Sequence, residues 1–430
     1  MTYAEALTFL FDQLPMYQRV GLSAFKKDLD NTLRLCKYLG HPEQQFRSVH
    51  IAGTNGKGSS AHMIAAALIA AGHKTGLYTS PHLKDFCERI RIDGRPISQQ
   101  AVVNFVLNYQ NYLSELKPSF FEMSVGLAFE QFAETKVDIA VVEVGLGGRL
   151  DSTNVIIPEA NLITNIGYDH TDMLGETLPE IAAEKAGIIK AGVPVVIGDY
   201  NPETLPVFEQ KAASENSEII LAQQKYRIEK KESTEQHQQI AVYENGALRF
   251  DDLKLSLTGS YQLWNLPGVL ATIERLNEQG FAISDDNIRE GLESVQKLTG
   301  LKGRWQQIGE NPTIIADTGH NIEAFQEIIN QISSYQYQNL HLVLGFVQGK
   351  AIDKILSLFP KDAYFYFCKP AVPRGMNVAE IAETADNNGL NYQTTPSVKD
   401  ALRQALAKAQ KNDFIFVGGS TFVVAELDQI

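Results

Sequence analysis

A glycine-rich turn between an apolar segment and an alanine-rich segment constrains the fold of this chain most. The apolar segment covers residues 47–52 and has the pattern of a buried strand. The segment after the turn, residues 60–71, is rich in helix formers and closes at Gly72. Three glycines punctuate the turn itself, Gly53, Gly56 and Gly58. A strand that passes through such a turn directly into a helix predicts an α/β domain built around this connection.

The same turn has the chemistry of a phosphate-binding loop. Glycines let successive backbone N–H groups point toward one anion, and the positive end of the following helix faces the same point. Lys57 adds a positive charge on a flexible side chain. We expect the loop to bind a nucleoside triphosphate through Gly53, Thr54, Asn55, Gly56, Lys57, Gly58 and Ser59. The spacing departs from the common G-x-x-x-x-G-K-[ST] pattern, and a turn that merely joins strand to helix is the alternative.

Composition and charge narrow the range of partners. The chain has 430 residues, 44% of them hydrophobic, which is enough for two or three domains with their own cores. A net charge of -13 opposes a broad interface with nucleic acid. The first residues lack the features of a secretory signal and no apolar run reaches membrane-spanning length, so we expect a cytoplasmic protein without a membrane partner. The cysteines Cys36, Cys87 and Cys368 indicate neither a disulfide framework nor a metal site.

Strand and helix patterns alternate through the first half of the chain. The spacing of Leu7, Leu10, Phe11 and Leu14 predicts an amphipathic helix over residues 3–14. Short apolar runs predict buried parallel strands at residues 75–79, 138–144, 161–166 and 194–197. Helical patterns cover residues 98–116, 122–134 and 177–190. This alternation is typical of a doubly wound α/β domain.

The pattern changes in the second half. Residues 226–257 alternate as strands, and Asn245 with Gly246 predicts a hairpin turn between residues 240–243 and 247–250. Helical patterns return at residues 262–279 and 285–294, before a stretch rich in Gly, Lys and Arg at 297–309. Four further strands are predicted at residues 313–316, 340–344, 364–367 and 414–417. We therefore predict two α/β domains, residues 1–297 and a smaller one at residues 298–430.

Charged and polar side chains follow two of the predicted strands. Glu143 lies at the end of the strand predicted over residues 138–144, and open α/β sheets bind ligands at this end of their strands. It is therefore a candidate ligand for Mg²⁺ carried by the nucleotide, with a solvated carboxylate as the alternative. His170 follows the strand predicted over residues 161–166. A histidine that is merely packed or solvated explains His170 equally well when it is taken alone.

Lys185 lies among alanines and isoleucines on the helix predicted over residues 177–190. Apolar surroundings disfavour the charged ammonium, and the neutral amine can react with carbon dioxide to form a carbamate. A carbamate is an anion that is able to bind a metal ion. A solvated lysine on a helix is the alternative.

A second group of polar residues surrounds the strand predicted over residues 313–316. Asp317, His320 and Asn321 follow this strand, while Arg304 and Trp305 precede it. Each residue alone is explained by a structural role. Together they predict a second surface that faces the nucleotide across a cleft between the domains, where ligand sites tend to lie.

Taken in order, the motifs resemble those of the folylpolyglutamate synthase/dihydrofolate synthase family, part of the Mur ligase superfamily. They are GTNGKGS at 53–59, TSPHL at 79–83, FE at 121–122, EVGLGGRLD at 143–151, GYDH at 167–170, EKAG at 184–187, GR at 303–304 and DTGHN at 317–321. The resemblance covers almost the whole chain. It implies a P-loop ATPase domain of the Mur ligase type, with the pteroate site, over residues 1–297 and a Rossmann-like glutamate-ligase domain over residues 298–430.

The activity that the resemblance implies is ATP-dependent amide formation. The γ-phosphate of ATP passes to a carboxylate of dihydropteroate or of a folate glutamyl tail, and the amine of L-glutamate attacks the acyl phosphate. Catalytic roles would fall to Lys57, His170, Lys185, Arg304, Asp317 and His320. The glycine-rich turn would bind ATP together with Asn265, Arg304 and Asp317.

The resemblance also implies the remaining site residues. The pteroate would lie against Ser80, Pro81, His82, Leu83, Phe120, Phe121, Glu122, Met123, Leu150, Asp151 and Ser152. Two magnesium ions are expected, with Ser80, Glu143, His170 and a carbamylated Lys185 as their ligands. A monovalent cation is a further candidate, and we expect a monomer.

The chain departs from the family pattern in three places. Thr318 and Gly319 stand where Gly-Ala is common, residues 345–350 replace a frequent Asp-Lys pair, and Ser119 stands where threonine often precedes Phe-Glu. The first two departures bear on how glutamate is handled. The sequence leaves open whether one or both folate reactions occur. The competing functions are a peptidoglycan-type amino-acid ligase and an ATP-dependent switch that docks a protein partner without ligase chemistry.

Overall fold

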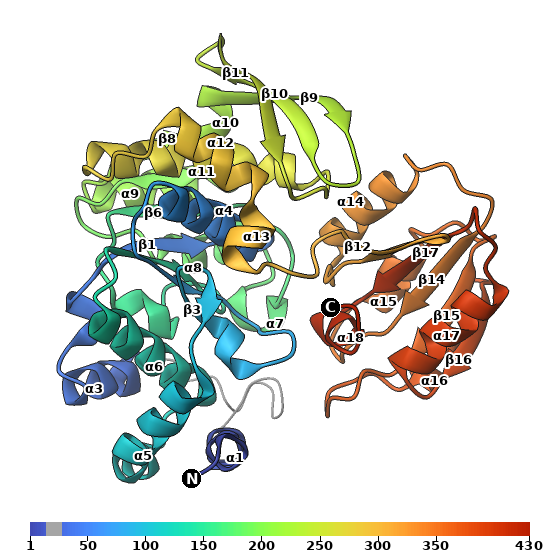
Figure 1. Cartoon of the computed structure of the whole chain (residues 1–430), viewed down its shortest axis with the longest axis horizontal. Coiled ribbons are helices and arrows are strands. Elements are labelled where there is room, and N and C mark those ends of the chain that lie inside the picture. Colours follow the sequence, from blue (N-terminus) through green and yellow to red (C-terminus); the bar gives the residue numbers. More distant parts are fainter. Residues whose placement is uncertain (14–27) are drawn as a thin grey trace. The chain divides into compact units, whose positions relative to one another are not determined.

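The computed structural model describes residues 1–13 and 28–430, which form two compact units. The first comprises Met1–Ser256 with Gln262–Leu301, apart from the residues not described, and the second Leu257–Tyr261 with Lys302–Ile430 (Figure 1). Helix α1 (Tyr3–Gln13) confirms the first predicted helix, although Leu14 lies outside the described residues. The functional division predicted between residues 297 and 298 stays a prediction, because packing alone defines the two units.

The first unit is built on a sheet with the strand order β4-β3-β2-β5-β1-β6-β7-β8. Six neighbouring strands, from β2 to β8 in this order, run parallel, while β3 and β4 are antiparallel at one edge. The strands are β1 (Arg47–Ala52), β2 (Thr75–Tyr78), β3 (Ile90–Ile92), β4 (Arg95–Pro96), β5 (Ile139–Glu143), β6 (Ala160–Ile163), β7 (Val195–Ile197) and β8 (Ile219–Leu221). Because β1 lies between β5 and β6, the glycine-rich turn lies at the carboxyl ends of parallel strands.

Helices pack on this sheet around two apolar clusters. One cluster joins α1, α3 (Asp30–Tyr38), α5 (Gln99–Leu116) and α6 (Phe120–Thr135) with β2 and β5. The other joins α8 (Leu178–Ala186) and α9 (Leu205–Ser214) with β6 and β7. Helix α4 (Lys57–Ala70) is buried along most of its length, under α11 (Gln262–Glu278) and α12 (Asp285–Glu293). Its alanines let α12 approach so closely that a Cβ added at Gly291 would lie 2.7 Å from the Cα of Ala67.

A separate antiparallel sheet completes the first unit. It contains β9 (Tyr226–Ser233), β10 (Gln238–Glu244) and β11 (Ala247–Leu255), in the order β11-β10-β9. Asn245 and Gly246 connect β10 to β11 with φ angles of 50° and 82°. These are the left-handed conformations that a tight hairpin turn requires, so the predicted hairpin is confirmed.

Two predicted elements of the first unit end early. Strand β6 ends at Ile163 rather than at residue 166, because the next residues turn to bond the glycine-rich loop. Helix α8 ends at Ala186 rather than at residue 190. At Gly187 the backbone passes so close to Arg149 that a Cβ would lie 2.4 Å from the Cα of Arg149. The glycine therefore marks the end of the helix.

The second unit contains a six-stranded sheet in the order β12-β13-β17-β14-β15-β16, with only β12 antiparallel to its neighbour. The strands are β12 (Gln306–Glu310), β13 (Thr313–Ala316), β14 (Leu340–Leu344), β15 (Tyr364–Cys368), β16 (Asn391–Thr395) and β17 (Phe414–Gly418). The helices are α14 (Ile322–Ile332), α15 (Ile352–Leu356), α16 (Val378–Asn387), α17 (Val398–Lys408) and α18 (Thr421–Ala425). The four predicted strands are confirmed. The sequence pattern does not reveal β12 and β16, which are polar strands at the two edges of the sheet.

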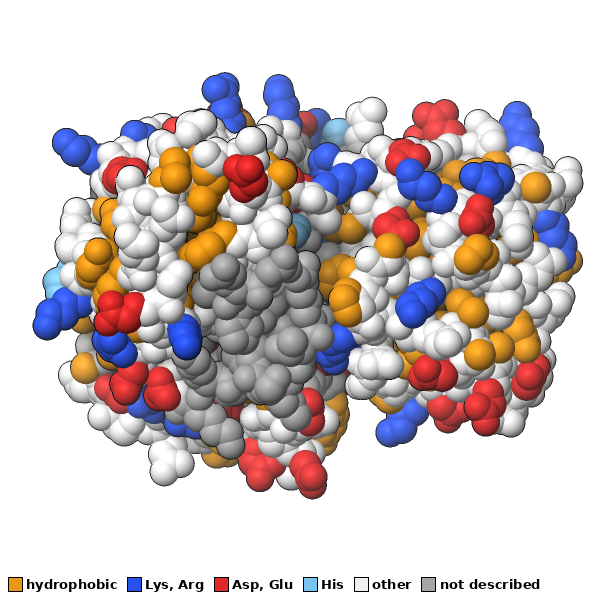
Figure 2. Space-filling view, turned by 90° about the horizontal axis from the view of Figure 1, so that it is seen from below, with side chains coloured by type: hydrophobic (Ala, Val, Ile, Leu, Met, Phe, Trp, Pro, Cys, Tyr) orange, Lys and Arg blue, Asp and Glu red, His pale blue; other side chains and the backbone are white. Residues whose placement is uncertain are grey.

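The surface has mixed character. On the face shown in Figure 2, basic and acidic side chains are scattered among apolar ones. The most exposed large apolar side chains among the described residues are Ile157 and Trp264, at 78% and 62% exposure. Among the residues that the structure describes, every helix is too short or too polar to cross a membrane.

Candidate functional site

The glycine-rich turn connects β1 to α4 through two residues that only glycine suits. Gly53 has a φ of 146°, and a Cβ there would lie 1.8 Å from Oγ1 of Thr164. Gly56 caps the start of α4 with a φ of 85°, and a Cβ there would lie 2.1 Å from Oδ1 of Asn265. Both positions combine left-handed backbone with close contact, so any side chain would displace a neighbour.

Residues after β6 hold the turn in place. Asn165 accepts hydrogen bonds from the backbone N–H of Thr54 (3.0 Å, to its carbonyl) and of Asn55 (2.8 Å, to Oδ1). Thr164 donates from Oγ1 to the carbonyl of Asn55 at 2.6 Å. Since the backbone N–H groups of Thr54 and Asn55 are already bonded to Asn165, the N–H groups at the start of α4 are the stronger candidates for binding an anion.

Two lysines converge on the turn. Lys57 donates from Nζ to the carbonyls of Gly53 (2.9 Å) and Thr54 (3.0 Å). Lys185, which is 3% exposed, donates from Nζ to the same Gly53 carbonyl at 3.1 Å. Burial, followed by the charge of Lys57, lowers the pKa of Lys185 to about 7. The turn therefore carries concentrated positive charge, and Lys185 is partly neutral near pH 7.

The beginning of α11 closes over the start of α4. Gln262, which is buried, donates from Nε2 to Oγ of Ser59 at 3.1 Å. Asn265 donates from Nδ2 to Oε1 of Gln262 at 3.0 Å, and its Oδ1 is the atom that lies against Gly56. The predicted nucleotide residue Asn265 is thus brought to the turn from more than 200 positions away in the chain.

Three of the four predicted metal ligands lie at or after the carboxyl ends of β2, β5 and β6, and the fourth, Lys185, lies on α8. Glu143 ends β5, is 4% exposed and accepts a hydrogen bond at 2.9 Å from the backbone N–H of Ser80, which follows the neighbouring β2. His170 follows β6 and caps α7 (Thr171–Leu174) with a φ of 52°. The described residues contain no cluster of three or more His, Cys, Asp or Glu side chains placed to hold a metal ion. The carboxylate of Glu143 and the hydroxyl of Ser80 fit Mg²⁺ that takes its other ligands from phosphates and water, whereas the imidazole of His170 is a less usual ligand for this ion.

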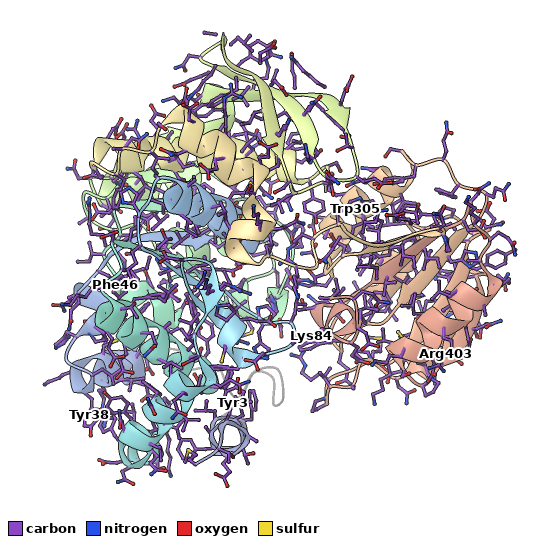
Figure 3. All side chains as sticks on the ribbon, in the orientation of Figure 1. Tyr3, Tyr38, Phe46, Lys84, Trp305 and Arg403 are labelled. Atoms are coloured by element: carbon purple, nitrogen blue, oxygen red, sulfur yellow. The ribbon has the colours of Figure 1, made fainter. Side chains whose placement is uncertain are left out.

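The predicted pteroate loop is stiffened by its own sequence. The backbone N–H groups of Leu83 and Asp85 donate to the carboxylate of Glu88, at 2.9 and 3.1 Å. Asp85 also caps the 3₁₀ helix η3 (Phe86–Arg89), and Tyr3 of α1 donates from its hydroxyl to Oδ1 of Asp85 at 2.8 Å. Figure 3 labels Tyr3 and Lys84, the neighbour of Asp85 in this loop. The loop is therefore fixed from both sides.

Within this loop His82 pairs with an arginine. Nε of Arg89 donates to Nδ1 of His82 at 2.8 Å, and burial together with the charge of Arg89 lowers the pKa of His82 to about 3. The guanidinium of Arg89 also lies over the ring of Phe120, with 5.2 Å between Cζ and the ring centre. His82 is thus a neutral side chain held between the loop and α6.

The predicted residues of α6 have mainly packing and capping roles in this structure. Glu122 forms a capping box with Ser119 and also accepts from Nδ2 of Asn31 at 3.2 Å. Phe120 stacks on Phe11 of α1, with ring centres 5.2 Å apart. Phe121 contacts the backbone at Gly145, and Met123 lies fully buried in the core. The contacts of these residues with a pteroate stay a prediction.

Asp151 organises the glycine-rich segment after β5. It is 5% exposed and accepts from the backbone N–H of Gly145 (3.0 Å), Leu146 (2.9 Å) and Thr153 (3.0 Å). Burial raises its pKa even though these bonds favour the charged form. Its neighbours Leu150 and Ser152 are half-buried and buried. The carboxylate thus shapes the segment that begins beside Glu143.

The second unit gathers the predicted residues Arg304, Asp317 and His320 at the end of β13. Asp317 is 3% exposed and accepts from the backbone N–H of Trp305 (2.7 Å; labelled in Figure 3), that of Gly319 (2.7 Å) and the hydroxyl of Tyr261 (2.5 Å). Burial raises the pKa of Asp317, against the charge of Arg304. Arg304 donates to Oγ1 of Thr318, and Nδ1 of His320 lies 3.2 Å from the Thr318 carbonyl. The departure from the family pattern at Thr318 therefore contributes a hydroxyl that orients Arg304.

Sequence reasoning missed the residues that position the predicted ones. Asn165 and Gln262 bond the turn, Arg89 holds His82, and Tyr261 holds Asp317. Asn165 lies two residues before the motif at 167–170 and Arg89 six residues after the motif at 79–83, and this proximity is the one signal the sequence offers for them. Gln262 and Tyr261 carry no such signal, because their partners are distant in the chain.

The comparisons with known proteins agree with this geometry. The family model of the Mur ligase middle domain matches residues 51–273, and that of the Mur ligase glutamate ligase domain matches residues 303–421. A dihydrofolate synthase/folylpolyglutamate synthase of Bacillus subtilis is 30% identical, over 99% of this chain and 98% of its own length. A solved structure of Escherichia coli FolC in complex with DHPP and ADP superposes with a TM-score of 0.86 at 26% identity, covering 99% of this chain and 96% of that one.

One group of relatives is longer. A probable bifunctional folylpolyglutamate synthase/dihydropteroate synthase of Haloferax volcanii is 33% identical over 99% of this chain. This chain spans about half the length of that relative, namely 50%. The similarity to it therefore concerns one half of a longer protein.

Proposed function

The chain belongs to the folylpolyglutamate synthase/dihydrofolate synthase family of Mur ligases, and from that premise we propose that it joins L-glutamate to dihydropteroate or to the glutamyl tail of a reduced folate. The observation that carries the proposal is the glycine-rich turn at the start of α4, where Lys57 and the buried Lys185 both reach the carbonyl of Gly53. Such a concentration of donors and positive charge suits the polyphosphate of ATP.

The reaction has two steps. A carboxylate oxygen of the acid substrate attacks the γ-phosphorus of ATP, so that the bond to the β–γ bridging oxygen breaks and ADP leaves. The amine of glutamate then attacks the carbonyl carbon of the acyl phosphate, an amide bond forms, and inorganic phosphate leaves with the bonding electrons. The amine loses one proton in this second step.

Lys57 is the residue on which the first step depends most. Two loop carbonyls accept hydrogen bonds from its ammonium. Because its side chain is flexible, rotation of the side chain alone can bring the ammonium to the β- and γ-phosphates. There it stabilises the charge that develops in the transition state between two anions. One well-placed donor typically lowers the free energy of such a transition state by about 3–4 kcal/mol. The amides at the start of α4 and the carboxamide of Asn265 also contact the nucleotide in this proposal.

Ser80, Glu143 and His170 would hold magnesium, with a carbamate on Lys185 as a further ligand. Bound magnesium would offset the repulsion between the phosphates and the acid. The burial of Lys185 supports the carbamate, because a pKa of about 7 leaves much of its amine neutral and able to add carbon dioxide. One proton is released when the carbamate forms.

The proposal also assigns roles in binding the pteroate and in supporting transfer. The pteroate would contact the loop that carries Ser80 and His82, the aromatic start of α6 and the segment at Asp151. Arg304 and Asp317 of the second unit would contact the nucleotide, and His320 would support transfer together with them. In this assignment residues 1–297 bind ATP and the acid, and residues 298–430 serve glutamate ligation.

The test is glutamate-dependent release of ADP by the purified protein, with products identified by mass spectrometry. Dihydropteroate and tetrahydrofolate are offered separately with ATP, Mg²⁺ and glutamate, in potassium and in sodium buffer. A mass increase by one glutamyl residue supports the proposal, and its pattern decides whether one or both folate reactions occur. Lys57→Ala is the matched negative control. Absence of glutamate-dependent ADP release with every pteroate and folate would remove the ligase function, and turnover of a UDP-muramoyl peptide instead would assign the other branch of Mur ligases.

A further inference from the structure

The pairing of Arg89 with His82 determines which nitrogen of the imidazole carries hydrogen. An arginine guanidinium has only donors and stays charged, so the ring nitrogen that faces it must be an acceptor. Nε of Arg89 lies 2.8 Å from Nδ1 of His82. Nδ1 is therefore unprotonated, and the hydrogen of the neutral ring lies on Nε2.

Arg89 is itself held firmly enough to impose this choice. It is 2% exposed, and its guanidinium packs on the ring of Phe120. No carboxylate among the described residues forms an ion pair with it, although Tyr78, Glu143 and Glu88 interact favourably with its charge. A buried guanidinium without an ion pair is costly to maintain. Arg89 donates from Nε to His82, and its guanidinium also interacts with the hydroxyl of Tyr78.

The other edge of the His82 ring is available for a ligand. In the part of the chain that the structure describes, Nε2 of His82 has no hydrogen-bond partner. It does not belong to the fully buried polar atoms without a partner. Nε2 is therefore not completely enclosed, in a side chain that is half-buried. The ring cannot turn away freely, since the loop is anchored by Glu88 and by the bond from Tyr3 to Asp85. The structure thus presents one oriented N–H group from the loop that follows β2.

We propose that Arg89 is a positioning residue that locks His82 with its hydrogen on Nε2, so that His82 is a fixed hydrogen-bond donor to an acceptor atom of the acid substrate. The acceptor is an oxo oxygen or an unprotonated ring nitrogen of the pteridine class. This inference rests on the proposed function for the identity of the substrate. The tautomer and its cause rest on the geometry of the protein alone.

The tautomer is tested by ¹⁵N NMR of the whole protein labelled at histidine, without substrate and at one fixed pH. The His82 signals are assigned by their loss in His82→Gln. The wild-type ring is expected to show hydrogen on Nε2 and none on Nδ1. Arg89→Met is expected to give a mixture of tautomers, while Arg89→Lys, which keeps a donor, restores the wild-type pattern at least in part. A wild-type ring with hydrogen on Nδ1 would overturn the proposal, whatever Arg89→Met does to folding.

A matched control is available two residues along the chain. Arg91 is also buried, but its guanidinium donates to the carbonyl of Gly94 at 3.3 Å instead of to a histidine. Arg91→Met should therefore leave the His82 signals unchanged. A shift in these signals as large as in Arg89→Met would show that loss of any buried arginine disturbs the loop, and would overturn the specific role of Arg89.

The donor role is tested by steady-state kinetics with dihydropteroate. His82→Phe keeps a ring but has no donor, so KM for dihydropteroate should rise about five- to tenfold with a smaller change in KM for ATP. His82→Gln, which can donate from its amide, should recover part of the loss. Equal changes in the two KM values would overturn the donor role. If the wild-type protein shows no ligase activity at all, the proposed function fails, and the NMR result still decides the tautomer.

Discussion

Replacing Gly56 by alanine tests the location of the nucleotide site. Gly56 and Gly72 lie just before and just after α4, with φ angles of 85° and 83°. A Cβ at Gly56 would lie 2.1 Å from Oδ1 of Asn265, whereas at Gly72 it would meet nothing within 4 Å. The two substitutions therefore impose the same backbone strain, and only Gly56→Ala adds a steric conflict.

The cost of each substitution follows from these contacts. Left-handed backbone costs an alanine about 1–2 kcal/mol, and this applies to both variants. Gly56→Ala must also push Asn265 aside and break its 3.0 Å bond to Gln262, at a further cost of about 1 kcal/mol. Since about 1 kcal/mol lowers the Tm of a unit of this size by about 2–4 °C, Gly56→Ala should melt below Gly72→Ala by that amount. Asn265→Ala should lower the Tm less in the Gly56→Ala background than in the wild type, because the bond to Gln262 is already broken there.

Binding of ADP with Mg²⁺, measured by titration calorimetry well below both melting temperatures, separates the two positions. Gly56→Ala should weaken ADP binding roughly ten- to hundredfold, because the shifted turn loses hydrogen bonds to charged phosphate. Gly72→Ala should bind ADP as the wild type does. Equal affinity in the two variants would refute the placement of the phosphates at the start of α4.

Three further predictions concern the charged residues. Lys57→Ala should lower kcat a few hundredfold while the folded protein still melts cooperatively; a loss below tenfold in turnover assays contradicts the role of Lys57. The pKa of Lys185 is about 7, so its amine is about half neutral at pH 7, against about one in three thousand for an ordinary lysine. At fixed carbon dioxide pressure its ¹³C carbamate NMR signal should rise from pH 6 to pH 8 and vanish in Lys185→Met; a pH-independent signal speaks against it. The pKa of Lys185 is lower in the folded chain than in the unfolded chain, so the unfolded chain binds more protons between about pH 7 and 10.5. The free-energy cost of burying Lys185 therefore falls as pH rises through that window. Tyr261→Phe removes a donor to the Asp317 carboxylate and should cost about 1–3 kcal/mol, less as pH falls through the raised pKa of Asp317; calorimetric melting over a series of falling pH values measures both.

The sequence reveals those parts of the fold that depend on local pattern. The buried parallel strands inside both sheets are short apolar runs and are recognised, most of them to within one or two residues. The parallel edge strand β8, which is only half-buried, is not predicted. Strands β12 and β16 escape notice because edge strands are half solvated and tolerate polar residues. The ends of β6 and α8 are misplaced for a different reason. Contacts with the glycine-rich turn and with Arg149 end these elements, and no local pattern reports them.

The residues of the candidate site likewise include some that a local pattern predicts and others that it does not. The turn, Glu143 and Asp317 are found because each follows directly on a recognisable strand. Their supporting partners come from far along the chain: Gln262 reaches Ser59 across 203 positions, and Asn165 reaches Asn55 across 110. Such pairs depend on the order of strands and helices in space. The bond between Arg89 and His82 spans only seven positions, but it depends on the path of a loop, which the sequence alone does not give.

The proposed ligase reaction depends on an acyl phosphate formed at the turn before α4. Dihydropteroate labelled with ¹⁸O in its carboxylate tests this directly, with mass spectrometry of the inorganic phosphate released during glutamate ligation. An acyl phosphate transfers one carboxylate oxygen to the phosphate that leaves, so each phosphate released from fully labelled substrate should carry one ¹⁸O atom. Unlabelled phosphate, released together with amide product, would contradict the account.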